Sequence, residues 1–266
     1  MRPSLPLALA ALLVARALPA QSAAAGVADR IRAGDAASDR LDLPAALVEY
    51  EAALALDSMD YTANWKTAYA LVDLGAKTPD SLPDPERDRL YRRAETLARR
   101  ATEVNPRGAD GWFMLANASG RTALTKSRKE RVKSANAIYD HATTALGLDH
   151  RHDGAYHVLG RWNAEIMRLS GIERLFAKSF MGGRRFGLAS WDEAVKYLER
   201  AVQLRPDFIY HHLDLAAVYV DRRRFADAAR ELDLIPTLPR LNANDTLYVR
   251  EAAALRKRVT AETAGK

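Results

Sequence analysis

The sequence predicts an all-α fold, a helical-repeat solenoid of about five helix pairs followed by a C-terminal capping helix. One spacing pattern occurs twice, with small or apolar residues at offsets 0, +4 and +7 and a proline at +12. Its two copies are Ala94, Ala98, Ala101, Pro106 and Ala194, Leu198, Ala201, Pro206. Offsets of four and seven share one helical face, and a proline follows the end of a helix. A composition rich in Ala, Leu, Arg and Glu, with no run that alternates like a strand, favours helix throughout.

The first three pairs follow from apolar periodicity and from the residues that end each run. The first pair joins a helix over 28–39 to one over 44–56. The second begins near Trp65 and ends with the helix that leads to Pro106. The third opens at Trp112 and closes with the apolar positions of 138–145.

The fourth pair opens at Tyr156, contains a Leu-Gly pair at 159–160 and ends at Pro206. The fifth, over 209–236, has the standard repeat length without a gap. A last helix over 245–260 is polar on one side, which is typical of a terminal cap.

Pairs two, three and four exceed the standard length, and we attribute this to long turns within each pair. These insertions cover 75–84, the strongly basic stretch 121–133 and the longest one, 169–190. Insertions in solenoids collect on one edge, where partners often dock.

Helix, proline turn and helix in this order resemble the tetratricopeptide repeat. The fourth pair is also similar to the regulator of microtubule dynamics family. The resemblance rests on Tyr-His-Val-Leu-Gly-Arg-Trp over 156–162, Ala-Lys-Ser-Phe-Met-Gly-Gly over 177–183 and the Glu-Ala pair at 193–194. It extends from about residue 94 to 254 and implies the fold and a capacity to bind a protein segment or a lipid.

In tetratricopeptide proteins the first helix of each pair lines a concave groove, and this resemblance selects nine candidate positions. A mixture of Arg, Asn, His and aromatic side chains suits an extended peptide or an acidic head group. The alternative is a solvated inner face with local ion pairs, such as Arg161 with Glu165, and with Trp162 packed between helices. The candidates are Lys66, Phe113, Asn117, Arg121, His157, Arg161, Glu165, Tyr210 and Asp221.

The 169–190 insertion supplies four further candidates, Phe176, Phe180, Arg184 and Arg185. Aromatic and basic residues around a Gly-Gly turn fit a flap over the groove or an element that touches lipid headgroups. The alternative is a short inserted helix whose Phe side chains fill a cleft in the stack.

The N-terminus has the pattern of a secretory signal peptide over 1–20, with a cut after Ala20 or as late as Ala25, which leaves 26–266 as the repeat domain. The chain has no cysteine, so lipoprotein anchoring and disulfides are excluded, and the expected location is periplasmic or secreted. Loss of Arg2 and Arg16 with the signal peptide lowers the net charge from +6 to +4. So small a positive charge gives little support for nucleic-acid binding.

The sequence offers no catalytic constellation: no Gly-x-Ser-x-Gly and no phosphate loop after a strand. The cluster of His150 and His152 with Asp149 and Asp153 lacks the spacing of a helical metal site. We therefore expect no enzyme activity, cofactor or metal. The predicted function is an exported scaffold that binds a protein or peptide segment in its groove. The alternative is a carrier of a lipid or amphiphile that uses the 169–190 insertion, and no nucleic-acid partner is expected.

Overall fold

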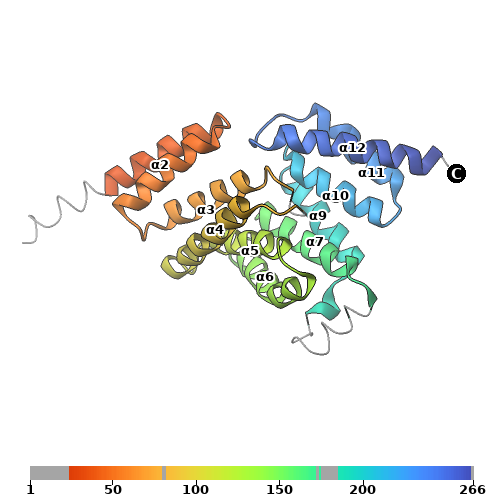
Figure 1. Ribbon diagram of the computed structural model, residues 1–266, viewed down its shortest axis with the longest axis horizontal. Helices are drawn as coiled ribbons and strands as arrows, with labels where there is room; N and C mark the ends of the chain where they lie inside the picture. Colours follow the sequence, from red (N-terminus) through yellow and green to blue (C-terminus); the bar gives the residue numbers. More distant parts are fainter. Residues whose placement is uncertain (1–23, 80–81, 172–173, 175–184, 265–266) are drawn as a thin grey trace, which may run out of the picture.

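The computed structural model describes residues 24–79, 82–171, 174 and 185–264 (Figure 1). It confirms the all-α solenoid of helix pairs. The pairs are 24–39 with α2 (Leu43–Leu56), α3 (Tyr61–Gly75) with α4 (Pro85–Val104), α5 (Ala109–Leu124) with α6 (Arg128–Leu148), α7 (Asp153–Arg168) with α9 (Trp191–Leu204), and α10 (Ile209–Asp221) with α11 (Phe225–Leu234); α12 (Asp245–Ala264) follows as the cap. Within these ranges no helix is both long enough and apolar enough to span a membrane.

Capping residues and prolines mark the ends of several helices. The side chains of Asp60 and Ser190 accept hydrogen bonds from the backbone N–H groups three residues later, at 2.7 and 3.0 Å. At the other end, the N–H groups of Asn105 and Arg205 donate to carbonyls four residues earlier, at 2.9 and 3.0 Å. The next residue is a proline in both cases, and it cannot continue the helix.

The repeated spacing pattern marks the face that packs inside each pair. All six of its helical residues are fully buried, and all but one of them are alanines. Alanine lets two helix axes approach closely, and the area that it removes from water supports the stack. These residues are Ala94, Ala98, Ala101, Ala194, Leu198 and Ala201.

A glycine in the first helix of three pairs receives a large side chain from the second helix. A Cβ atom added to Gly34 or Gly75 would lie 2.4 or 2.5 Å from the ring of a tyrosine sixteen residues later. At Gly160 the added atom would lie 2.5 Å from the Cγ atom of Leu198. The absence of a side chain at these positions therefore sets the distance between the paired helices.

Replacing Gly160 with alanine is expected to lower the free energy of unfolding by roughly 1–2 kcal/mol, because overpacking against Leu198 outweighs the better helix propensity of alanine. Gly147 in α6 is the matched control, since an added Cβ there meets no atom within 4 Å. Gly147→Ala should leave stability unchanged or raise it. Urea unfolding of both variants is the measurement, and equal effects at the two positions would refute the assigned packing.

The long turn expected over 121–133 is wrong. Helix α5 continues to Leu124 and α6 begins at Arg128, so the turn covers only 125–127. Glu130 accepts hydrogen bonds from the backbone N–H and hydroxyl of Ser127, at 3.2 and 2.6 Å, and these contacts stabilise the start of α6. The extra residues therefore lengthen two helices. The other two insertions do separate the helices of their pairs, at 76–84 and 169–190.

The segment 238–244, between the 3₁₀ turn η2 (Ile235–Thr237) and α12, returns to α3 (Figure 1). Asn242 Nδ2 donates to Oδ2 of Asp73 at 2.5 Å and to the Tyr69 hydroxyl at 3.3 Å. Asn244 Nδ2 donates to the Asp73 carbonyl at 2.8 Å. Asp73, Asn242 and Asn244 are all buried. Burial raises the pKa of the Asp73 carboxyl to about 6 although Asn242 donates to it. These contacts close the row of first helices α3, α5, α7 and α10 into a ring, with the helix over 24–39 outside it.

Candidate functional site

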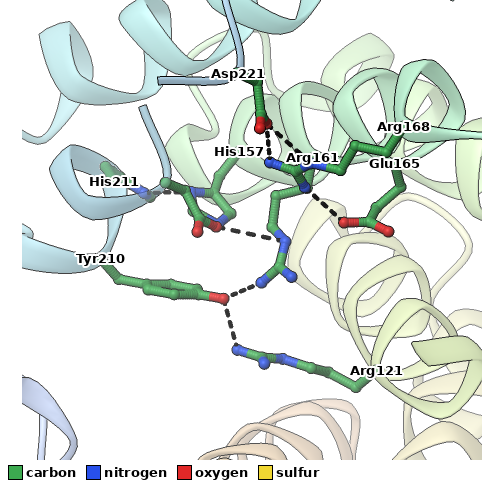
Figure 2. Close-up of polar contacts among 9 residues, drawn as sticks. Arg121, His157, Arg161, Glu165, Arg168, Tyr210, His211 and Asp221 are labelled. Carbon is green, nitrogen blue, oxygen red and sulfur yellow. Dashed lines mark hydrogen bonds and ion pairs between the residues drawn. The ribbon is translucent and has the colours of Figure 1, made fainter. Parts of the chain in front are cut away.

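The first helices α5, α7 and α10 bring several of the predicted groove residues together around Tyr210 (Figure 2). Nη2 of Arg121 donates to the Tyr210 hydroxyl at 3.0 Å, and Nη1 of Arg161 donates to the same oxygen. The ring of Tyr210 is stacked on Tyr248 of α12, with centroids 4.5 Å apart. Two cationic groups from different repeats thus converge on one neutral oxygen whose position the stacking fixes.

Asp214, one turn after Tyr210, neutralises part of this positive charge. Its Oδ2 atom lies 3.4 Å from Nε of Arg161 and 3.0 Å from Nε2 of His157. Burial alone would raise the pKa of the Asp214 carboxyl, but the Arg161 guanidinium and His157 outweigh it and hold this pKa well below its usual range. Asp214 is therefore ionised, and it compensates the charge of Arg161 inside the groove wall.

A pair of buried histidines joins α7 to α10. The Nδ1 atoms of His157 and His211 lie 2.9 Å apart, and Nε2 of His211 lies 2.9 Å from Oδ2 of Asp153. Burial lowers the pKa of His157, and it lowers that of His211 to about 4 although Asp153 opposes the shift. Both rings therefore favour the neutral form.

A second ion-pair cluster lies at the end of α7 (Figure 2). Arg168 donates to Glu165 at 2.7 Å and to Oδ2 of Asp221 through two nitrogens, at 3.0 and 2.6 Å. The ion pair of Arg161 with Glu165 that sequence reasoning considered is not formed among these residues, because Arg168 takes Glu165 and Arg161 takes Asp214. Glu165 and Asp221 thus fix an arginine at the rim.

The remaining groove candidates lie farther along the ring. Lys66 pairs with Asp35 at 2.6 Å and so belongs to the N-terminal pairs. Phe113 packs against the ring of His152, with centroids 4.6 Å apart, and Asn117 lines the groove beside Arg121.

The insertion candidates divide into two groups. Arg185 pairs with Asp140 of α6 at 2.6 Å. Phe176, Phe180 and Arg184 lie outside the described residues. The neighbouring Phe186 is buried against the ring of Trp162, whose indole N–H donates to the Ala135 carbonyl at 2.7 Å. Trp162 therefore packs between helices, as one of the two sequence interpretations held.

His152 caps a helix. Its Nδ1 atom accepts a hydrogen bond from the backbone N–H of Ala155 at 3.2 Å, at the start of α7. Among the residues that the structure describes, no three His, Asp or Glu side chains are grouped in the manner of a metal site.

Two cavities adjoin each other, and both reach the cluster around Tyr210. The larger, of about 320 Å³, is the groove itself and is lined from α3, α5, α7, α10, α12 and the closing segment. The smaller, of about 190 Å³, lies between α5, α6 and α7. The two cavities share five of their lining residues, Asn117, Arg121, His157, Val158 and Tyr210.

Sequence reasoning missed several residues of this site. Asp214 follows Tyr210 by four residues, and that spacing on one helical face was a usable signal. His211 and Asp153 had no local signal, because their contacts depend on how neighbouring repeats pack. The same holds for Asn242 and Tyr248, which reach the groove through the ring closure.

Comparison with solved structures identifies the fold. TTC0263, a thermophilic TPR protein in Thermus thermophilus, is 17% identical, with a TM-score of 0.59 over 88% of this chain and 97% of that one. PilF of Pseudomonas aeruginosa is 16% identical, with a TM-score of 0.50 over 91% of this chain and 90% of that one. At such identities the likeness establishes the tetratricopeptide fold and nothing more specific.

Comparison with curated protein sequences gave no match. The family model of regulator of microtubule dynamics protein 1-3 matches residues 28–260. This range contains every helix of the ring and nearly all of α12. The chain therefore belongs to the regulator of microtubule dynamics protein 1-3 family.

Proposed function

We propose that this protein is an exported, non-catalytic scaffold that binds a segment of a partner protein in the groove. The observation that carries the proposal is the groove of about 320 Å³, where Asn117 and Arg121 lie beside aromatic rings that fixed contacts hold in place. Amide and guanidinium donors match the carbonyl and carboxylate acceptors of an extended peptide. Aromatic walls give apolar contact area at a low cost in side-chain entropy.

The test is affinity capture from envelope extract with a variant that obstructs the groove. Asn117→Arg places a longer, charged side chain in the wall that both cavities share. Gln203→Arg on α9 is the matched control, because it makes the same kind of change at an exposed position outside both cavities. We expect partners retained by the wild type and by Gln203→Arg to be lost with Asn117→Arg. Equal retention by all three proteins would refute groove binding.

A second candidate function is carriage of a lipid or amphiphile. The smaller cavity favours it, since apolar side chains form most of its wall and arginines also line it. An acyl chain buried beside an anionic head group would satisfy both features. Organic extraction or native mass spectrometry of the purified protein tests this function, and a preparation that is free of lipid and ignores anionic vesicles would contradict it.

Export is supported by Arg2, the apolar run over 5–14 and the small residues that end at Ala20. N-terminal sequencing of the protein from its native host is the direct test. We expect the mature chain to begin near Gln21 or Gly26. An intact Met1 in a membrane fraction would contradict cleavage and indicate that the segment anchors the scaffold.

A further inference from the structure

The smaller cavity is a side chamber of the groove. Its walls come from α5 and α7, which are first helices, and from α6, which is the second helix of its pair. It therefore extends between the helices of the third pair, away from the face that a bound segment would follow. Its apolar walls include Val132, Ala135, Ile138, Trp162, Ile166 and Leu169.

The charged groups around this chamber favour an anionic ligand. Four arginines line it, Arg121, Arg131, Arg161 and Arg168, and Glu165 is the carboxylate in the same lining. Behind the wall, Asp214 pairs with Arg161 and Asp221 with Arg168, so the positive charge is partly compensated. Arg131 donates to the backbone carbonyls of Leu124 and Lys126, at 2.7 and 3.1 Å, and these acceptors are neutral. The chamber thus combines an apolar interior with four guanidinium groups against three carboxylates, in its lining and directly behind it.

The Tyr210 hydroxyl marks the position of the anion. Arg121 and Arg161 both donate to it at the boundary between the two cavities. A carboxylate oxygen is a stronger acceptor for guanidinium donors than a neutral phenol. A carboxylate at this boundary would replace or share these two hydrogen bonds, and the groove beyond Tyr210 would hold the rest of the ligand.

The size of the chamber limits what enters it. A dry cavity of about 150 Å³ is enough for a benzene molecule. The chamber, at about 190 Å³, exceeds this size but stays below the 300–1,000 Å³ that is usual for small-molecule pockets. One aromatic or large aliphatic side chain fits this volume.

We propose that the chamber receives one aromatic or large aliphatic side chain of the groove-bound segment, and that an Asp or Glu next to it in that segment pairs with Arg121 and Arg161. This inference rests on the proposed function, since it describes which segment the groove selects. The shared walls let the peptide backbone stay in the groove while a single side chain turns into the chamber. The apolar contact supplies affinity, and the adjacent carboxylate supplies selectivity.

The first experiment selects short random peptides displayed on phage against the purified protein. We expect enrichment of an aromatic residue or leucine adjacent to Asp or Glu. If no peptide is enriched, the proposed function itself fails. If peptides are enriched without that pair, the groove binds segments and only this inference is overturned.

The second experiment fills the chamber without disturbing the fold. Gly120 of α5 lines it, and an added Cβ there meets no atom within 4 Å. Gly120→Leu should weaken binding of a selected peptide roughly tenfold or more, which fluorescence anisotropy measures. Gly147→Leu, the same change in equally open space outside the chamber, should leave the Kd within about twofold. Equal affinities of the two variants would overturn the proposal.

The third experiment is a double-mutant cycle between Arg121→Gln and neutralisation of the acidic residue of the peptide to its amide. We expect the peptide change to weaken binding to the wild type by about tenfold and to weaken binding to Arg121→Gln much less. Additive losses would overturn the assigned ion pair. Dodecanoate is the probe for an acyl chain, and if it binds the wild type more tightly than Gly120→Leu while no peptide does, the chamber holds a lipid and the proposal is wrong.

Discussion

Replacement of Arg161 by methionine is expected to lower the free energy of unfolding by roughly 3 kcal/mol. The guanidinium holds Asp214 ionised in a groove wall where the two side chains are only 25% and 19% exposed. Methionine keeps most of the apolar stem but leaves the carboxylate beside His157 without its main counter-charge. Urea unfolding at neutral pH measures the loss.

Arg168 provides the matched control for this prediction. It lies on the same helix, but its side chain is 37% exposed and its partners Glu165 and Asp221 are about one third exposed. Solvent screens such pairs, so Arg168→Met should cost less than about 1 kcal/mol. An equal cost at the two positions would show that Arg161 and Asp214 are no more strongly coupled than a surface ion pair.

Acidification between pH 6.5 and pH 4 is expected to destabilise the fold through His211. Burial lowers the pKa of this histidine from 6.5 to about 4, so the unfolded chain takes up a proton in this range that the folded chain refuses. Stability is fully present above pH 6.5 and is lost as the pH falls toward 4, by roughly 3 kcal/mol.

Variants separate this contribution from groups of opposite sign. Burial raises the pKa of Asp73. At His212, burial lowers the pKa, but the hydrogen bond with Glu231 outweighs it and raises the pKa. Groups with raised pKa values stabilise the folded state in acid, which opposes the contribution of His211. The measurement is therefore the difference between wild type and His211→Asn, with unfolding followed from pH 7.5 to 4. The variant should lose less stability on acidification than the wild type. His150→Asn, at an exposed position, should keep the wild-type slope, and the assignment fails if His211→Asn keeps it too.

Much of the fold was predictable because tetratricopeptide-like packing depends on small and apolar residues that lie four and seven positions apart on one helix. Ala101 with Pro106 and Ala201 with Pro206 defined the ends of α4 and α9 correctly. The stretch 121–133 was misassigned because its many basic residues resemble a solvated loop. Val132 within this stretch begins a series of buried apolar residues at every third position that continues with Ala135 and Ile138. The spacing of Ser127 and Glu130 also matches a capping box, which predicts a helix start at this point.

The site was predictable only where a side chain occupies one of the groove-lining positions of the repeat. Those positions selected Arg121, Arg161 and Tyr210, and the structure places these three side chains in one hydrogen-bonded cluster. Asp214, the counter-charge of Arg161, does not occupy one of these groove-lining repeat positions, so it was not selected. The contact between His157 and His211 joins residues 54 apart, so it depends on the angle between repeats, which no local pattern encodes.

The hydrogen bonds of Asn242 and Asn244 to Asp73 also bear on how the molecule opens. In an open array each repeat contacts only its neighbours, and unfolding proceeds inward from the ends. Here the closing segment fastens the C-terminal side to α3, so the helices from α3 to α12 gain the character of one cooperative unit. The helix over 24–39 and α2 lie outside this closure, with α2 packed on α3. Amide protons in those two helices should therefore exchange with solvent first, while the groove keeps its shape.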